Sequence, residues 1–127
     1  MWLNTKNRKV YKSWFGWLAA ALWKPSLYNS EPLKELVYDN IFPEQIFKKL
    51  RVGAVSIPDG KYKVWTEEDP DILEGILASS AFPGMLTPIQ ARGKTWLDGG
   101  LRRVTPIKDA IEEGATDIDV IMTAPKR

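Results

Sequence analysis

The chain has 127 residues, of which 44% are hydrophobic and 27% are charged, so it is long enough for one domain with a single core and is too apolar for a disordered chain. It contains no cysteine and no histidine. Disulfides, Cys/His zinc sites and a serine nucleophile activated by a histidine of this chain are therefore excluded. The net charge of +2 is too small to predict binding to nucleic acid.

The first 24 residues differ from the rest. Residues 1–30 carry five basic side chains and no acidic ones, and the apolar run 14–23 contains three tryptophans, Trp14, Trp17 and Trp23. The run is shorter than the ~20 residues of a membrane-spanning helix and lacks the small-residue cleavage site of a signal peptide. We interpret residues 1–24 as a basic, Trp-rich helical segment that either packs into the core or lies at a membrane surface, among the lipid headgroups. The expected location is cytoplasmic or peripheral to a membrane.

The remainder of the chain is residues 25–127. Its first half begins with a helix and continues with a hairpin. Ser30 is a candidate N-cap for a helix whose stripe of Leu33, Leu36 and Val37 has helical spacing and ends near Asn40. A short helix is expected over residues 43–50. Next come a strand over 51–57, a turn over 58–60 and a return strand over 61–66.

The second half alternates helices and strands. Asp69 and Pro70 predict the start of a helix that ends near Ser80. Short strands are expected over residues 87–91 and 95–97, a helix from Thr105 to Gly114 and a buried strand over 117–122. A helix, a glycine stop and an apolar strand form half of a βαβ unit, so the predicted class is α/β with a mixed sheet.

Asp98 is the carboxylate with the clearest candidate role. It ends a predicted strand and precedes Gly99 and Gly100, which allow a sharp turn and leave the aspartate side chain uncrowded. The Asp-Gly pair is also a common way to form a tight turn. The residue pattern alone leaves both interpretations open.

Several ordered motifs over residues 26–123 resemble the C-terminal half of patatin-like phospholipases. They are the segment before the middle helix, Ser26 to Leu33; the helix end and proline turn Ala78-Ser79-Ser80-Ala81-Phe82-Pro83-Gly84; Thr87-Pro88-Ile89; Trp96-Leu97-Asp98-Gly99-Gly100-Leu101; Thr105-Pro106-Ile107; and Gly114-Ala115. The resemblance implies a three-layer α/β/α fold with a mixed sheet, present here without its N-terminal half. It implies that residues 25–127 are the C-terminal part of that domain.

The resemblance further implies a Ser-Asp dyad, in which Asp98 is the general base and Gly99 and Gly100 complete the motif. No Gly-x-Ser-x-Gly nucleophile elbow and no glycine-rich oxyanion loop occur in these residues, so no nucleophile is assigned. Ser79 and Ser80 are the substitutes to test, but they occupy the family's structural Ala-Ser position. Arg102-Arg103-Val104 departs from the Asn-containing stretch that is common in the family.

No metal site and no cofactor are expected. The acidic residues Glu67, Glu68, Asp69, Asp71 and Glu74 lie close together in the sequence, but they lack the alternating ligands and central glycine of a calcium loop. We interpret them as the solvated start of a helix.

The function implied by the resemblance is hydrolysis of a lipid or phospholipid acyl ester. This chain would be inactive alone and would need a missing N-terminal half, or would associate with itself. Two alternatives come from other classes: a non-catalytic binding or regulatory module that keeps part of the fold, and a peripheral membrane-binding protein dominated by residues 1–24.

Overall fold

The computed structural model describes residues 12–13, 28–57 and 59–122. The expected helix over the Trp-rich run, including Trp14, Trp17 and Trp23, lies outside these residues. In chain order the elements are β1 (Lys12–Ser13), β2 (Tyr28–Asn29), α2 (Glu31–Asn40), the 3₁₀ helix η3 (Pro43–Gln45), β3 (Arg51–Ile57), β4 (Tyr62–Thr66), α3 (Ile72–Ser79), β5 (Ile89–Ala91), β6 (Lys94–Asp98), the 3₁₀ helix η4 (Gly99–Leu101) and α4 (Ile107–Glu112).

The main sheet has the order β4-β3-β6-β5, and all its neighbouring strands are antiparallel. Strand β3 is central and pairs Val52 with Trp65 of β4 and Ser56 with Trp96 of β6. Residues that face one another across a ladder lie on the same side of the sheet. Val52, Trp65, Ser56 and Trp96 therefore belong to one face. A separate short pairing joins β1 to β2.

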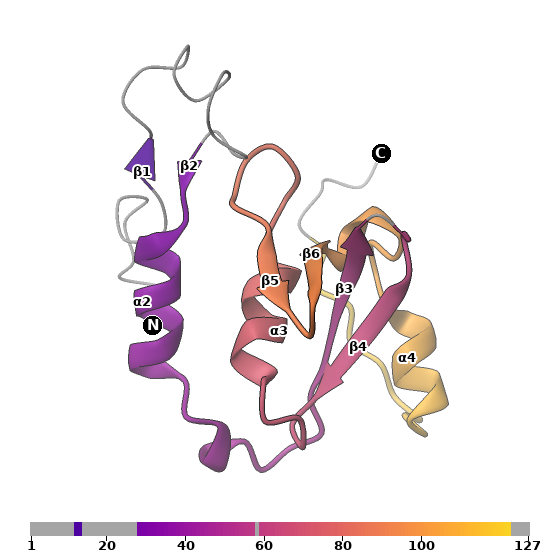
Figure 1. Ribbon diagram of the computed structural model, residues 1–127. Helices are drawn as coiled ribbons and strands as arrows, with labels where there is room; N and C mark the ends of the chain where they lie inside the picture. Colours follow the sequence, from indigo (N-terminus) through magenta and orange to yellow (C-terminus); the bar gives the residue numbers. More distant parts are fainter. Residues whose placement is uncertain (1–11, 14–27, 58, 123–127) are drawn as a thin grey trace.

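Helices cover the two faces of this sheet unequally (Figure 1). Helix α3 contacts all four strands, and α2 packs against α3. Helix α4 lies on the other side, where the Tyr62 hydroxyl donates to Asp109 Oδ2 at 3.2 Å and Arg51 Nε donates to Glu113 Oε1 at 2.9 Å. No residue of α4 is buried, so this second layer is thin.

Trp65 is the centre of the core. It is 0% exposed and meets Trp96 edge to face, with 4.7 Å between ring centroids. Helix α3 comes close to the sheet at this point because Gly75 has no side chain: a Cβ atom there would lie 2.5 Å from Cγ of Trp65. Ile72, Leu77 and Ala78 of the same helix complete the contact.

Most predicted elements are confirmed. The hairpin, the strands around Arg92-Gly93 and the helices beginning near Ser30, Asp69 and Thr105 all form. Ser30 occupies the N-cap position of α2 without a side-chain bond; Asn29 Oδ1 accepts from the Glu31 N–H at 3.0 Å instead. Over residues 43–50 only the short η3 forms.

The buried strand expected over residues 117–122 is wrong. These residues are exposed and form no strand; Ile121 is 94% exposed. An apolar run can only become a buried strand where a neighbouring strand edge and a covering layer are available, and the described residues offer neither here. The parallel strand that would make the sheet mixed is thus absent from the described part, while the α/β class, with helices packed against a four-stranded antiparallel sheet, is confirmed.

The Gly75 contact gives a stability prediction. In an ordinary helix interior, Gly→Ala raises stability by about 0.5–1 kcal/mol. Here the added methyl group overlaps the buried Trp65 ring, so we expect Gly75→Ala to lower the free energy of unfolding by about 1–3 kcal/mol, the usual range for an overpacked core. Chemical denaturation measures the change. Asp39→Ala, on the exposed side of α2, is the control and should change little; an unchanged or raised stability of Gly75→Ala would show that α3 does not approach the sheet this closely.

Candidate functional site

Asp98 ends β6 and is held there from two directions. Its backbone N–H donates to the Ala81 carbonyl at 3.0 Å, which ties the end of the strand to the segment after α3. Its carboxylate accepts from the Gly100 N–H through Oδ1 at 2.8 Å. The side chain is partly exposed, and Oδ2 has no hydrogen-bond partner among the described residues. One carboxylate oxygen is thus fixed while the other is available.

The two glycines after Asp98 serve different purposes. At Gly99 a Cβ atom would lie 2.4 Å from the backbone oxygen of Gly53, and at Gly100 it would lie 3.2 Å from Asp98 Oδ1. Neither glycine has a positive φ. The sharp turn expected from the sequence is therefore made with ordinary backbone angles, and the requirement at Gly99 is close approach of the β3 and η4 main chains.

An open cavity of about 440 Å³ lies beside Asp98. Ser79, at the end of α3, lines it together with Asp98, whereas Phe82 and Pro106 provide apolar walls and Arg103 a positive charge. Ser80 is not part of this lining: it is exposed, and its hydroxyl donates to the Ile76 carbonyl at 3.0 Å. The structure thus places one of the two candidate serines in the lining of the same cavity as the aspartate and the other outside it.

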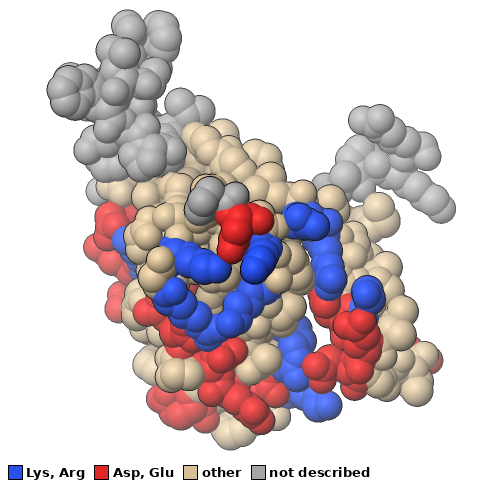
Figure 2. Space-filling view, turned by 45° about the vertical axis from the view of Figure 1, so that its right-hand side comes forward, with Lys and Arg blue, Asp and Glu red and all other residues tan. Residues whose placement is uncertain are grey.

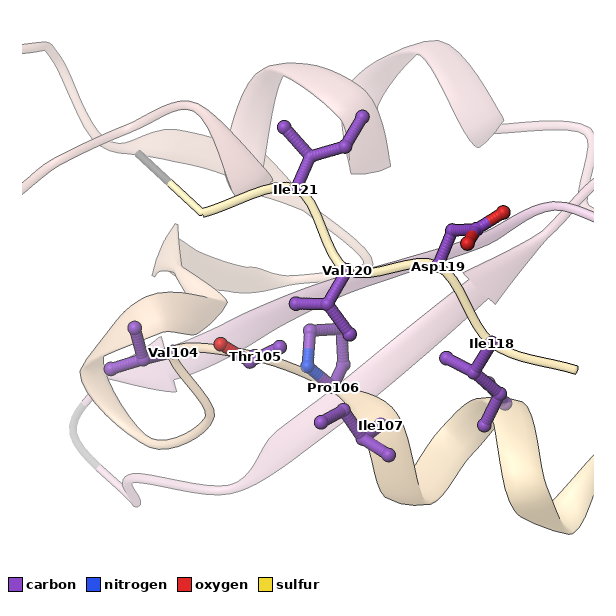
Figure 3. A pocket seen from close by; sticks show the side chains of 9 residues that line it. Val104, Thr105, Pro106, Ile107, Ile118, Asp119, Val120 and Ile121 are labelled. Atoms are coloured by element: carbon purple, nitrogen blue, oxygen red, sulfur yellow. The ribbon is translucent and has the colours of Figure 1, made fainter. Parts of the chain in front are cut away.

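A second, smaller hollow of about 280 Å³ lies between the start of α4 and the extended segment that follows it. Figure 3 shows the side chain of Val120 over Pro106, with Ile107 and Ile118 on the α4 side, while Ile121 points away from them. This hollow has mainly aliphatic walls and no titratable side chain besides Asp119. It therefore offers apolar contact rather than chemistry.

Three of the acidic residues before α3, Glu67, Asp69 and Asp71, form ion pairs with arginines, which the sequence does not reveal. Arg92 Nη2 lies 3.0 Å from Asp69 Oδ1 and 2.5 Å from Asp71 Oδ1, and its guanidinium is 4.8 Å from the Trp65 ring centroid. Glu67 accepts from the Leu50 N–H and from Arg51. Basic and acidic side chains accordingly lie next to one another on the face shown in Figure 2. Within the described ranges no three carboxylates group as metal ligands would.

The sequence signal for Arg92 is its place beside Gly93 in an expected turn between two short strands. In the structure Arg92 has a φ of 51°. Left-handed backbone is uncommon for a residue with a side chain. A hairpin turn of this kind projects a long side chain, and an arginine can reach an acidic helix start. Sequence spacing alone does not reveal that the two segments, 21 residues or more apart in the chain, are neighbours.

Comparison with known proteins identifies the family. The family model of patatin-like phospholipases matches residues 2–111, so the chain belongs to the patatin-like phospholipase family, a family of lipid hydrolases. The chain is similar to the uncharacterized protein YjjU of Escherichia coli (strain K12), with 39% identity over 56 residues that make up 43% of this chain and 16% of that protein. The chain thus spans only a small part of the length of this relative. No solved structure matches it at a significant level.

The family match begins at residue 2 and so includes the segment 1–24 that differs in composition. The boundary drawn between residues 24 and 25 stays a prediction. Among the residues that the structure describes, none of the helices has the length and apolar character needed to cross a bilayer.

The two glycines should respond differently to alanine. Gly99→Ala forces a methyl group against the Gly53 backbone, which cannot rotate away, and should lower the melting temperature by several degrees. Gly100→Ala meets only the Asp98 carboxylate and should leave the melting temperature nearly unchanged. Thermal unfolding of both variants decides; equal losses would mean that the turn, and not the close approach to β3, sets the requirement.

The Arg92 ion pairs predict a pH dependence of stability. Hydrogen bonding to Arg92 lowers the pKa of Asp71, and the Thr66 N–H, followed by Arg92, lowers the pKa of Asp69. Because both values are lower in the folded chain, their stabilisation is complete above the ordinary Asp pKa of about 3.9 and is lost as the pH falls below it. We expect Arg92→Met to lose less stability than the wild type between pH 5 and pH 3. Urea unfolding across this range measures it, with Arg102→Met as the charge-matched control; parallel curves for Arg92→Met and the wild type would contradict the assignment.

Proposed function

We propose that this chain carries the aspartate half of a Ser-Asp site that hydrolyses lipid acyl esters, and that it is inactive without a polypeptide that supplies the serine. The observation that carries the proposal is the arrangement of Asp98. Gly100 orients its carboxylate through Oδ1, Oδ2 has no hydrogen-bond partner among the described residues, and the residue lines an open cavity. A general base needs this arrangement, because it must be fixed yet reachable by the proton it accepts.

In the proposed reaction, Asp98 accepts the proton of a serine hydroxyl as the serine oxygen attacks the ester carbonyl carbon. The tetrahedral intermediate collapses to an acyl-serine and releases the alcohol, which takes up the proton from Asp98. Water then attacks the acyl-serine with Asp98 again accepting a proton, and a fatty acid leaves as the serine is regenerated. No histidine is required, which agrees with a chain that contains none.

Ser79 is a poor candidate for that serine although it lines the same cavity. It is the last residue of a regular α-helix, and no strained elbow presents its hydroxyl, as a nucleophile in an α/β hydrolase requires. Two residues further on, the carbonyl of Ala81 accepts a hydrogen bond from the Asp98 N–H, so this segment supports the end of β6. We therefore assign the Ser79 region to positioning of the aspartate.

The surface around the site supports the need for a further polypeptide. Val104, which lines the Asp98 cavity, is 88% exposed, and Ile121 and Met122 are 94% and 67% exposed. Contiguous exposed apolar residues usually mark a surface that another chain or segment covers. We propose that the remaining part of a patatin-like domain covers it, with a second copy of this chain as the alternative occupant.

The competing function is that of a binding or regulatory module, in which the same cavity holds an acyl ligand without cleaving it. The absence of a Gly-x-Ser-x-Gly elbow from the sequence favours it. Peripheral membrane binding through Trp14, Trp17 and Trp23 is a separate proposal, and those residues lie outside the described part of the structure.

Activity measurements distinguish these functions. The purified chain should not hydrolyse a short-chain nitrophenyl ester above the buffer rate. Fused or co-expressed with a patatin-like polypeptide that contains the elbow, it should become active and co-elute with that polypeptide. Asp98→Asn should then reduce kcat by about 10²–10⁴-fold, the usual effect of removing a general base, at an unchanged melting temperature.

Two results would contradict the proposal. The first is turnover by the isolated chain that Ser79→Ala or Ser80→Ala abolishes, which would place the nucleophile in this chain. The second is full activity of the Asp98→Asn variant in the reconstituted enzyme, which would make Asp98 a turn residue only. Asp119→Asn is the control for removing a negative charge from the neighbouring hollow, outside the lining of the Asp98 cavity, and should retain full activity.

A further inference from the structure

Two contacts hold Arg103 at the wall of the Asp98 cavity. Its Nη1 donates to Asp109 Oδ1 at 2.5 Å, and its guanidinium lies 4.4 Å from the ring centroid of Tyr62. The Tyr62 hydroxyl in turn donates to Asp109 Oδ2 at 3.2 Å. These three side chains come from β4, α4 and the loop after η4, so the arginine is fixed from two sides before any ligand arrives.

The guanidinium has more donors than the protein uses. Arginine offers five N–H groups in a planar fork, and only Nη1 has a side-chain partner among the described residues. The Arg103 side chain is 34% exposed, compared with 12% for Asp109. Of the residues that line the cavity, Arg103 alone is positively charged. Free donors, fixed orientation and access to the cavity are what an anion subsite requires.

The surrounding charges restrict which anion fits. Asp109 neutralises the charge of Arg103, and Asp98 adds a negative charge to the same wall. A doubly charged phosphate would be repelled by these two carboxylates. A singly charged phosphodiester can accept from the guanidinium fork at a smaller electrostatic cost, and its acyl chains would meet the apolar walls formed by Phe82, Val104 and Pro106.

We propose that Arg103 is a specificity-determining residue that binds the headgroup phosphodiester of a glycerophospholipid whose ester lies at Asp98. The inference rests on the proposed lipid acyl hydrolase function and names the part of the substrate that this chain recognises. It also gives a role to Arg103 within the Arg102-Arg103-Val104 stretch. Arg102 reaches away from this wall, with its Nη1 donating to the Gly60 carbonyl at 3.0 Å.

The experiment is a binding titration of the full chain with soluble ligands. Dihexanoylphosphatidylcholine below its micelle concentration carries the phosphodiester, dihexanoylglycerol lacks it, and inorganic phosphate carries the anion without the lipid. Amide NMR shifts of Gly99, Gly100 and Val104 report binding at the cavity. We expect the phospholipid to bind about tenfold or more tightly than either of the other two, and Arg103→Gln to remove that advantage.

The adjacent arginine is the matched control. Arg102→Gln makes the same change in charge outside the cavity lining and should leave phospholipid binding unchanged. Arg103→Lys keeps the charge but loses the planar fork, so it should bind the phospholipid more weakly than the wild type. If Arg103→Gln lowers the melting temperature, Arg103→Lys replaces it as the test variant. A tenfold change corresponds to about 1.4 kcal/mol of binding free energy.

Several results would overturn the inference. Equal losses for Arg102→Gln and Arg103→Gln would show general charge attraction. Inorganic phosphate binding as tightly as the phospholipid would identify a free-phosphate site, and equally tight binding of dihexanoylglycerol would show that the headgroup is not recognised. None of these outcomes affects the Asp98→Asn test in the reconstituted enzyme, so the subsite and the hydrolytic function fail or succeed separately.

Discussion

The contact between Gly75 and Trp65 is the constraint on which the rest of the described structure depends. A buried indole occupies the space that a side chain at position 75 would take, which allows α3 to pack directly on the antiparallel sheet. The same indole receives Trp96 from β6 and the Arg92 guanidinium from the β5–β6 turn. One ring thus holds a helix, two strands and a turn in a fixed relation, and aromatic contacts of this kind add to the stabilisation from burial alone.

That fixed relation extends to the candidate site through the backbone. The end of α3 leads into Ala81, whose carbonyl receives the Asp98 N–H, and the β3 main chain comes against Gly99 on the other side. The position of the aspartate is therefore set by main-chain contacts of two elements that the core already orders. Side chains are left to shape the cavity, with Tyr62, Asp109 and Arg103 forming a second supported group on the α4 side. Preorganised groups of this kind lose little entropy when a ligand binds.

The sequence predicted the elements whose signals are local. The pairing of β3 with β4, the helix stripe of Leu33 and Val37, and the Asp-Gly-Gly stop after β6 all depend on residues within a few positions of one another, and all were confirmed. The sequence failed where partners are distant or absent. The apolar run 117–122 has the pattern of a strand but no described neighbour to pair with, and the link of Arg92 to Asp69 and Asp71 joins segments that only the fold brings together. The role proposed for Asp98 comes from resemblance to a family, since its local pattern equally fits a turn.

The exposed segment after α4 affects how long the chain persists in a cell. Its residues are exposed and form no strand, and Val120, Ile121 and Met122 are consecutive apolar residues, a stretch that other extended chains can join through their own backbones. Asp117 and Asp119 place charge within this stretch, as gatekeeper residues do beside aggregation-prone strands. Quality control that recognises uncovered apolar strands would remove chains that lack a covering partner. The abundance of this chain would then depend on whether this apolar segment is covered.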